Sequence, residues 1–301
     1  MRRFMTAAVL LPLGCSTPAE TTDEAPTNTS EQTTGGTRGD AQTGSTSGVA
    51  GTTHSETSGR DSHGADGSTG MTETPEDGLY TDAIDTIIVE VDYESGAQPE
   101  TGNRVGFGAV WDVFETNAEA LFSENPKTLV VDREPGDQQD IGALDAESFT
   151  ASDLRALADE HRDAVPTEGT RTYYVLWVDG TYADDSGPRP SVLGVSVGDN
   201  VIGMFKPTLR NGGGLFVDLL EQAVLVHEFG HASGLVNAGV PLQSDHQDEE
   251  NGRHCTNEDC VMYWALDGVE SALDQVLASV VAPDTVLWGE LCLDDVRAAA
   301  Q

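Results

Sequence analysis

The segment from Val224 to Leu235, VLVHEFGHASGL, constrains this chain more than any other feature. It predicts an α-helix, because residues four positions apart lie on one helix face and His227 and His231 have that spacing. Further apolar residues extend the same broad face toward the N-terminus: Leu219, Leu220, Ala223 and Val224. Gly234 stands where such a helix would end, since glycine adopts the left-handed conformation of a helix C-terminus at little cost.

This spacing also suits a hydrolytic metal site. His227 and His231 could hold one zinc ion, while Glu228 would point toward a water molecule on that ion. The five-residue pattern is short enough to arise by chance on an ordinary helix. The downstream glycine, the apolar helix and a second segment that contains histidine favour a zinc site over a chance match.

The N-terminus has the layout of a short secretory signal. Two arginines follow Met1, an apolar stretch ends at Leu13, and Gly14 precedes Cys15. The stretch is too short to span a membrane. Its end resembles a bacterial lipoprotein signal, in which Cys15 would become the lipidated first residue, although Pro12 departs from the usual pattern. By that resemblance, the serine after Cys15 favours the outer membrane of a Gram-negative cell, with plain secretion as the alternative.

Residues 16–79 have the composition of a disordered tether. They are rich in Thr, Ser, Gly, Asp and Glu and have no aromatic residue, so they cannot bury enough apolar surface to offset their ordering entropy. Flexible-chain scaling gives them a reach of roughly 45 Å. His54 and His63 lie in this stretch, where we expect them to be passive. Residues 80–301 remain, which is long enough for one domain with a substantial core.

The acidic composition excludes two classes of partner. The formal net charge is −37, whereas nucleic acids and anionic lipid surfaces require basic patches. Solubility is the simplest explanation of such a charge. We expect a monomer that binds no nucleic acid and contacts a membrane only through the lipid anchor at Cys15.

Strand and helix patterns alternate before the histidine segment. Strands are predicted at three ranges: Ile84–Asp92, Thr128–Val131 and Thr172–Val178. Helical spacing of apolar residues predicts one helix from Phe107 to Phe122, and Thr150 with Asp153 predicts the capped start of another. A further strand or hairpin fits Val192–Phe205. This order predicts an α+β fold in which a twisted, mixed and mostly parallel sheet packs on the histidine helix.

The element order resembles the zincin fold of zinc metallopeptidases. The histidine pattern followed by Gly234 resembles the metzincin signature, in which a third ligand comes three residues after the glycine. Here that position is Asn237, and an amide is a poor zinc ligand. The third ligand therefore comes from elsewhere, or the site is degraded.

A later segment, HCTNEDCVM from His254 to Met262, resembles the one that follows the helix in archaemetzincins. The resemblance implies that His254 is the third ligand, that Met262 is the Met-turn residue beneath the metal, and that an insertion precedes His254. His246 is the alternative third ligand, because its neighbouring carboxylates could orient an imidazole. Asp245 and Asp248 are weaker candidates.

The cysteines depart from the archaemetzincin pattern. That family has a later Cys-x-x-Cys pair that completes a structural zinc site, whereas here only Cys292 follows. A disulfide between Cys255 and Cys260 is therefore favoured, with a second metal as the alternative, because a four-thiolate site lacks one ligand.

Together these features predict a surface-tethered zinc metalloendopeptidase that acts on peptides or proteins. Glu228 would be the general base, and Tyr263 could either hydrogen-bond the oxyanion or pack in the core. One alternative is a non-catalytic zinc-binding or adhesion lipoprotein derived from a peptidase. Another is a zinc hydrolase of non-peptide amides. The sequence indicates neither a cleavage preference nor an activation step.

Overall fold

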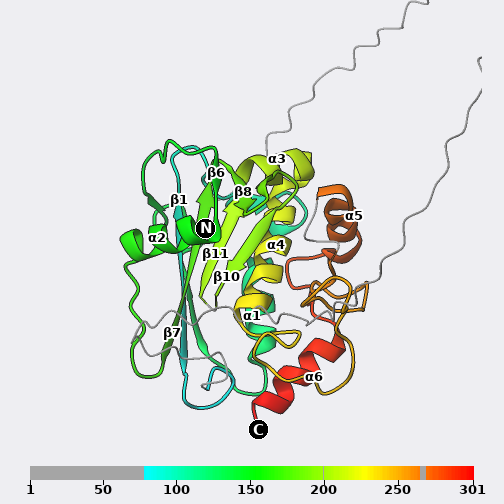
Figure 1. Ribbon diagram of the computed structural model, residues 1–301. Coiled ribbons are helices and arrows are strands. Elements are labelled where there is room, and N and C mark those ends of the chain that lie inside the picture. Colours follow the sequence, from blue (N-terminus) through cyan, green and yellow to red (C-terminus); the bar gives the residue numbers. More distant parts are fainter. Residues whose placement is uncertain (1–77, 199, 265–268) are drawn as a thin grey trace, which may run out of the picture. The chain divides into compact units, whose positions relative to one another are not determined.

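The computed structural model describes residues 78–198, 200–264 and 269–301 (Figure 1). The predicted signal segment, the lipidation site at Cys15 and residues 16–77 of the tether, with its two histidines, lie outside this range. Among the described residues, no helix has both the length and the apolar character needed to cross a membrane.

A mixed sheet forms the centre of the domain. In spatial order its strands are β10 (Gly194–Val197), β11 (Val201–Phe205), β7 (Thr170–Val178), β1 (Thr86–Tyr93) and β4 (Thr128–Val131). Neighbouring strands run parallel, except that β10 runs antiparallel to β11. A short strand, β5 (Gln139–Asp140), pairs in parallel with the end of β1. The predicted α+β fold with a mostly parallel sheet is confirmed.

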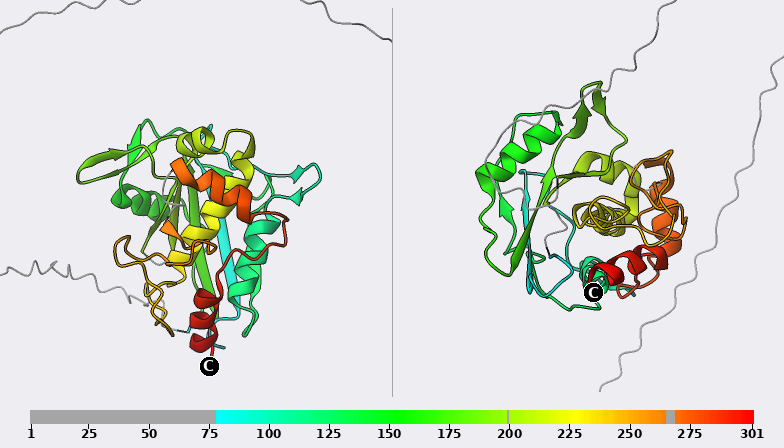
Figure 2. Two further views of the ribbon diagram at one scale, coloured as in Figure 1. Left: turned by 90° about the vertical axis from the view of Figure 1, so that its right-hand side faces the viewer. Right: turned by 60° about the horizontal axis from the view of Figure 1, so that its bottom comes forward.

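Helices cover both faces of this sheet (Figure 1). Residues alternate between the faces of a strand, so β1 directs Val89 and Val91 into the larger core and Glu90 to the opposite face. Helix α2 (Ala151–His161) covers one face, and α4 (Val217–Ala232) packs on the other (Figure 2). The remaining helices are α1 (Asp112–Leu121), α3 (Lys206–Gly213), α5 (Val269–Ser279), α6 (Glu290–Ala299) and the 3-10 helix η1 (Gly214–Phe216).

The predicted helix from Phe107 to Phe122 begins later than expected. Two of its first residues form strand β3 (Gly108–Ala109), which pairs with the preceding strand β2 (Asn103–Arg104) in a small hairpin. Gly106 and Gly108 adopt φ angles of 79° and 124°, which a helix does not accommodate. The apolar spacing across this boundary therefore came from two separate elements.

Two other local predictions are confirmed. Thr150 accepts a hydrogen bond from the Asp153 backbone at 3.2 Å, and the Asp153 carboxylate accepts one from the Thr150 backbone at 2.8 Å, which closes the capping box of α2. The β10–β11 pair is the expected hairpin, with Gly198 at φ 69° in its turn. A small second sheet consists of β6 (Ser148–Phe149), β8 (Thr181–Asp184) and β9 (Gly187–Arg189).

Helix α4 is buried on nearly all sides, because it lies between the sheet and the layer that contains α1, α5 and α6 (Figure 2). It ends at Ala232, and Gly234, two residues later, adopts the predicted left-handed conformation with φ 88°. A side chain there would meet the Val240 backbone nitrogen at 3.2 Å. The turn directs the chain away from the helix immediately after its second histidine.

The segment before α6 is fixed by one buried side chain of α1. The Asn117 side-chain amide donates to the Thr285 carbonyl at 2.9 Å and accepts from the Leu287 backbone nitrogen at 2.7 Å. The Trp288 indole donates to the Asn117 carbonyl at 2.7 Å. Fully satisfied buried polar groups of this kind specify one arrangement of the chain. They hold Trp288 against α4 beside the histidines.

Candidate metal centres

Three imidazole rings meet at the C-terminal half of α4. His227 and His231 come from successive turns of this helix, and His254 comes from the loop that follows it. The three candidate ligand nitrogens all lie within 4.8 Å of one another, and the Nε2 atoms of His227 and His231 are 3.2 Å apart. Tetrahedral coordination with Zn–N bonds of about 2.05 Å requires nitrogens about 3.3 Å apart. We call this group the three-histidine cluster.

Backbone carbonyls set the orientation of two of these rings. Nδ1 of His227 lies 2.7 Å from the Val261 carbonyl oxygen, and Nδ1 of His254 lies 2.6 Å from the Asn251 carbonyl oxygen. A carbonyl only accepts, so each Nδ1 donates its hydrogen and each neutral ring has its lone pair on Nε2. In these two rings Nε2 is the atom left for a metal, and together with His231 they form a donor set that fits a zinc ion.

Glu228 lies beside the cluster in a narrow space between α4 and β10. Its side chain is buried, and it passes close to Gly194 at the start of the strand. A Cβ atom at position 194 would lie 2.9 Å from Cγ of Glu228 and 3.2 Å from its Oε1. Gly194 thus provides the space that the carboxylate occupies.

Met262 is fully buried beneath α4. A Cβ atom at Gly230 would collide with the Met262 sulfur and would lie 2.9 Å from the Trp288 ring. The glycine next to His231 therefore lets both side chains pack directly on the helix backbone. Met262 thus lies against the segment of α4 that bears the histidines, and its role as the Met-turn residue stays a prediction.

The structure does not bring the other candidate ligands into the three-histidine cluster. Asn237 is exposed and donates to Gln247 at 3.3 Å. Asp245 is exposed, and Asp248 accepts hydrogen bonds within its own loop. Tyr263, the candidate for hydrogen-bonding the oxyanion, is half-buried, and its ring centroid lies 5.5 Å from that of Trp264.

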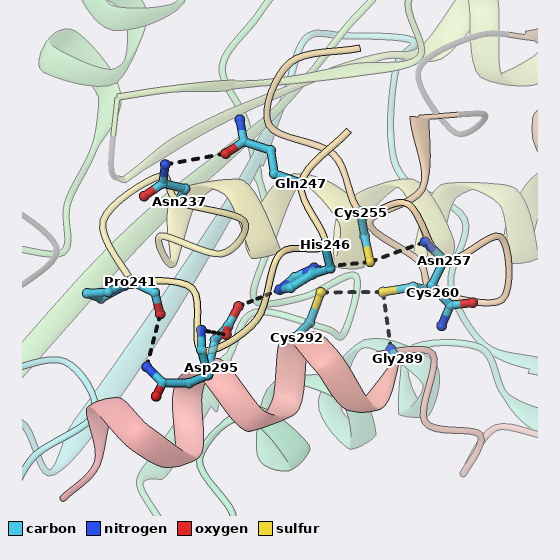
Figure 3. Close-up of polar contacts among 11 residues, drawn as sticks. Asn237, Pro241, His246, Gln247, Cys255, Asn257, Cys260, Gly289, Cys292 and Asp295 are labelled. Carbon is cyan, nitrogen blue, oxygen red and sulfur yellow. Dashed lines mark hydrogen bonds and ion pairs between the residues drawn. The ribbon is translucent and has the colours of Figure 1, made fainter. Parts of the chain in front are cut away.

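His246, the alternative third ligand, belongs to a second group of side chains. It lies among three buried cysteines, which are Cys255, Cys260 and Cys292 (Figure 3). We call these four residues the thiol cluster. Nδ1 of His246 lies 3.4 Å from Sγ of Cys255, and its Nε2 lies 2.7 Å from a carboxylate oxygen of Asp295.

The disulfide expected between Cys255 and Cys260 is not formed, because the three described cysteines are free thiols. Sγ of Cys260 lies 3.6 Å from that of Cys292, far beyond a disulfide bond of about 2.05 Å. Hydrogen bonds with Cys260 and Cys292 lower the pKa of the Cys255 thiol well below its usual range. Burial lowers the pKa of His246, but its hydrogen bonds with Asp295 and Cys255 outweigh burial and raise it overall.

Several residues of these sites had no signal in the sequence. The carbonyl groups of Val261 and Asn251 act through the backbone, where residue identity carries no information. Gly194 lies far from the histidine segment in the chain. Asp295 had one usable signal, since it stands three residues after Cys292 and such positions share a helix face.

Comparison with known proteins gives structural matches alone. No protein-family model and no curated protein matches this chain. The structure of archaemetzincin from Methanopyrus kandleri matches with 13% sequence identity and a TM-score of 0.39, covering 71% of this chain and 95% of that one. A zinc-dependent peptidase from Methanocorpusculum labreanum matches with 14% identity and a TM-score of 0.39, covering 70% of this chain and 99% of that one.

Proposed function

We propose that this protein is a zinc-dependent metallopeptidase. The observation that carries the proposal is the three-histidine cluster, in which three imidazoles converge next to Glu228, the residue that follows His227 in the helix. Three protein ligands leave one coordination position for water or substrate, which distinguishes a catalytic zinc site from a structural one. His231 is half-buried, so this side of the cluster is accessible.

A zinc ion held there lowers the pKa of water and polarises a carbonyl group. Glu228 is the general base: it removes a proton from the attacking water and transfers it to the leaving amine. Its position against Gly194 restrains the carboxylate on the β10 side of the site. Val261 and Asn251 keep the lone pairs of their histidines directed inward, because each carbonyl holds a ring hydrogen on Nδ1.

Strand β10 supports a peptide substrate over other amides. Within the described residues it pairs with β11 alone, so it forms one edge of the sheet, and Gly194 places that edge against Glu228. An exposed strand edge binds an extended peptide through main-chain hydrogen bonds. A peptide on β10 could extend in both directions past Glu228, which corresponds to cleavage within a chain.

The test is the Glu228→Gln variant of the zinc-loaded full chain. Cleavage of an unstructured peptide mixture, followed by mass spectrometry, should fall by about 10²- to 10⁴-fold, because the amide cannot accept the water proton. Zinc per chain should not change, since Glu228 is not a ligand. Glu160→Gln on the exposed surface of α2 is the matched control.

Two results would contradict the proposal in different ways. A Glu228→Gln variant with parental activity would remove Glu228 from the chemistry. A zinc-loaded parent that cleaves no peptide in the mixture would leave a binding protein instead. Attachment to the outer membrane through Cys15 remains a prediction from the sequence.

A further inference from the structure

The thiol cluster combines residues from three separate parts of the chain. His246 lies in the loop after α4, Cys255 and Cys260 flank the loop before Met262, and Cys292 lies on α6 (Figure 3). All four side chains are at most 1% exposed. We propose that the thiol cluster binds a second zinc ion, with His246 as its fourth ligand in place of a fourth cysteine.

The spacing of the ligand atoms fits tetrahedral zinc. Bonds of about 2.3 Å to sulfur and 2.05 Å to nitrogen require S–S separations of about 3.8 Å and S–N separations of about 3.5 Å. The Sγ atoms of Cys260 and Cys292 are 3.6 Å apart, and Sγ of Cys255 is 3.4 Å from Nδ1 of His246. Nδ1 of His246 and the sulfurs of Cys255 and Cys292 all lie within 4.8 Å of one another.

Asp295 determines which ring nitrogen faces the sulfurs. Its Oδ2 lies 2.7 Å from Nε2 of His246, and a carboxylate accepts, so Nε2 donates its hydrogen. Its other oxygen accepts from the Gln243 backbone nitrogen at 2.7 Å, which fixes the carboxylate. Nδ1 is therefore the atom that faces Cys255, and a metal ion would replace a proton there. Carboxylate–histidine pairs of this kind support metal ligands.

The sulfur atoms have the surroundings of thiolates. A buried free cysteine usually acts as a small apolar side chain and needs no polar partner. Here the Gly289 backbone nitrogen donates to Sγ of Cys260 at 3.1 Å, and that of Asn257 donates to Sγ of Cys255 at 3.5 Å (Figure 3). These donors stabilise negative charge on sulfur, as a metal-bound thiolate requires.

The position of the thiol cluster indicates a structural role. Four protein ligands leave no open coordination position, which is the arrangement of structural zinc. Cys255 directly follows His254, and its backbone nitrogen donates to the Met262 carbonyl at 2.7 Å. The Thr256 nitrogen donates to the His246 carbonyl at 2.8 Å. A zinc ion here would join the loop that carries His254 to α6, whether or not the three-histidine cluster is catalytic.

The test uses cobalt as a spectroscopic substitute for zinc in the full chain, with Cys15→Ser in every sample. The parent should bind two metal ions per chain and show a sulfur-to-cobalt charge-transfer band. Cys292→Ser should lose one ion and this band. His254→Ala, the matched control, should lose the other ion and keep the band. A parent that binds one ion or none, without the band, would overturn the proposal.

Variants that should still fold address His246 itself. His246→Cys supplies a fourth thiolate and should keep both ions, with a stronger charge-transfer band. Asp295→Asn should keep the band but weaken metal affinity at this site by about 10- to 100-fold, because the ring loses its orientation. If His246→Ala retained parental affinity and an unchanged spectrum, His246 would not be a ligand. Loss of peptide cleavage with both ions still bound would contradict the proposed function and leave this inference intact.

Discussion

The three-histidine cluster and the thiol cluster share one loop but differ in donor atoms and exposure. The first has three nitrogen donors, and His231 is half-buried at its accessible side. The second has three sulfurs and one nitrogen, all fully enclosed. Residues 254–262 contribute to both, since His254 belongs to one cluster and Cys255 to the other. A single peptide bond, between His254 and Cys255, thus separates the accessible three-histidine cluster from the enclosed thiol cluster.

The two clusters also differ in the groups that orient their histidine rings. In the three-histidine cluster, two rings are held by backbone carbonyls, which are neutral. In the thiol cluster, His246 is held by the buried carboxylate of Asp295. A carboxylate raises the basicity of the imidazole more than a carbonyl does, which favours tight binding. These contacts agree with the structural role proposed for the thiol cluster and the catalytic role proposed for the three-histidine cluster.

Stepwise chelation is the strongest test of this difference. With increasing chelator, we expect the metal of the three-histidine cluster to leave first and peptide cleavage to be lost, with little change in melting temperature. Removal of the second ion should then lower the unfolding free energy by about 4 kcal/mol, if its free concentration had been a thousandfold above Kd. For a domain of this size that is roughly 10 °C. Metal release, activity and melting are followed in the same samples.

Simultaneous loss of both ions and of the folded state would contradict this order. It would show that the two sites form one cooperative unit through residues 254–262. Chelation of His254→Ala provides the control, because this variant should begin with only the second ion bound.

Gly194→Ala tests how strongly peptide cleavage depends on the position of the Glu228 carboxylate beside the three-histidine cluster. The new Cβ would lie 2.9 Å from Cγ of Glu228 and from Val224, so the carboxylate must move. A displacement of about 1 Å costs about 100-fold in rate. We expect that loss in kcat/KM for peptide cleavage, with metal content unchanged at both clusters. Gly136→Ala is the control, since a Cβ there meets no atom within 4 Å. Unchanged kcat/KM would show that Glu228 tolerates displacement.

The three-histidine cluster could be predicted from the sequence more fully than the thiol cluster. The spacing of His227 and His231 is local, and so is the capping box of Thr150 and Asp153. Local periodicity also predicted the strands of the sheet. These features follow from helix and strand geometry within about ten residues.

The thiol cluster depends on contacts between residues that are far apart in the sequence. His246 meets Asp295 across 49 residues, and Cys260 meets Cys292 across 32. The sequence offered a second metal at these cysteines only as the alternative, because it did not show that His246 replaces the missing cysteine, and it favoured a disulfide that is not formed. The predicted start of α1 was wrong for a different reason. Gly106 and Gly108 turn the chain where the apolar pattern begins, and this pattern continues into the helix.

A third buried polar region allows pH effects on stability to be separated from those on the metal sites. A pocket of about 170 Å³ lies on the face of the sheet away from α4, lined by Glu90, Asp92 and Asp132 among others. Burial raises the pKa of Asp92 from 3.8 to about 6, a shift opposed by the Tyr174 hydroxyl, which donates to it at 2.8 Å. The folded protein thus holds this proton more tightly than the unfolded chain.

Asp92→Asn should therefore stabilise the protein at neutral pH. The ionised carboxylate destabilises the fold above about pH 6, and this cost disappears as the pH falls toward 3.8. A shift of about two units corresponds to about 3 kcal/mol, which water in the pocket reduces to about 1 to 2 kcal/mol. Urea unfolding at a series of pH values should show this gain at pH 7 and none near pH 4, with Glu160→Gln as an exposed control. A gain independent of pH would instead indicate better packing of the amide.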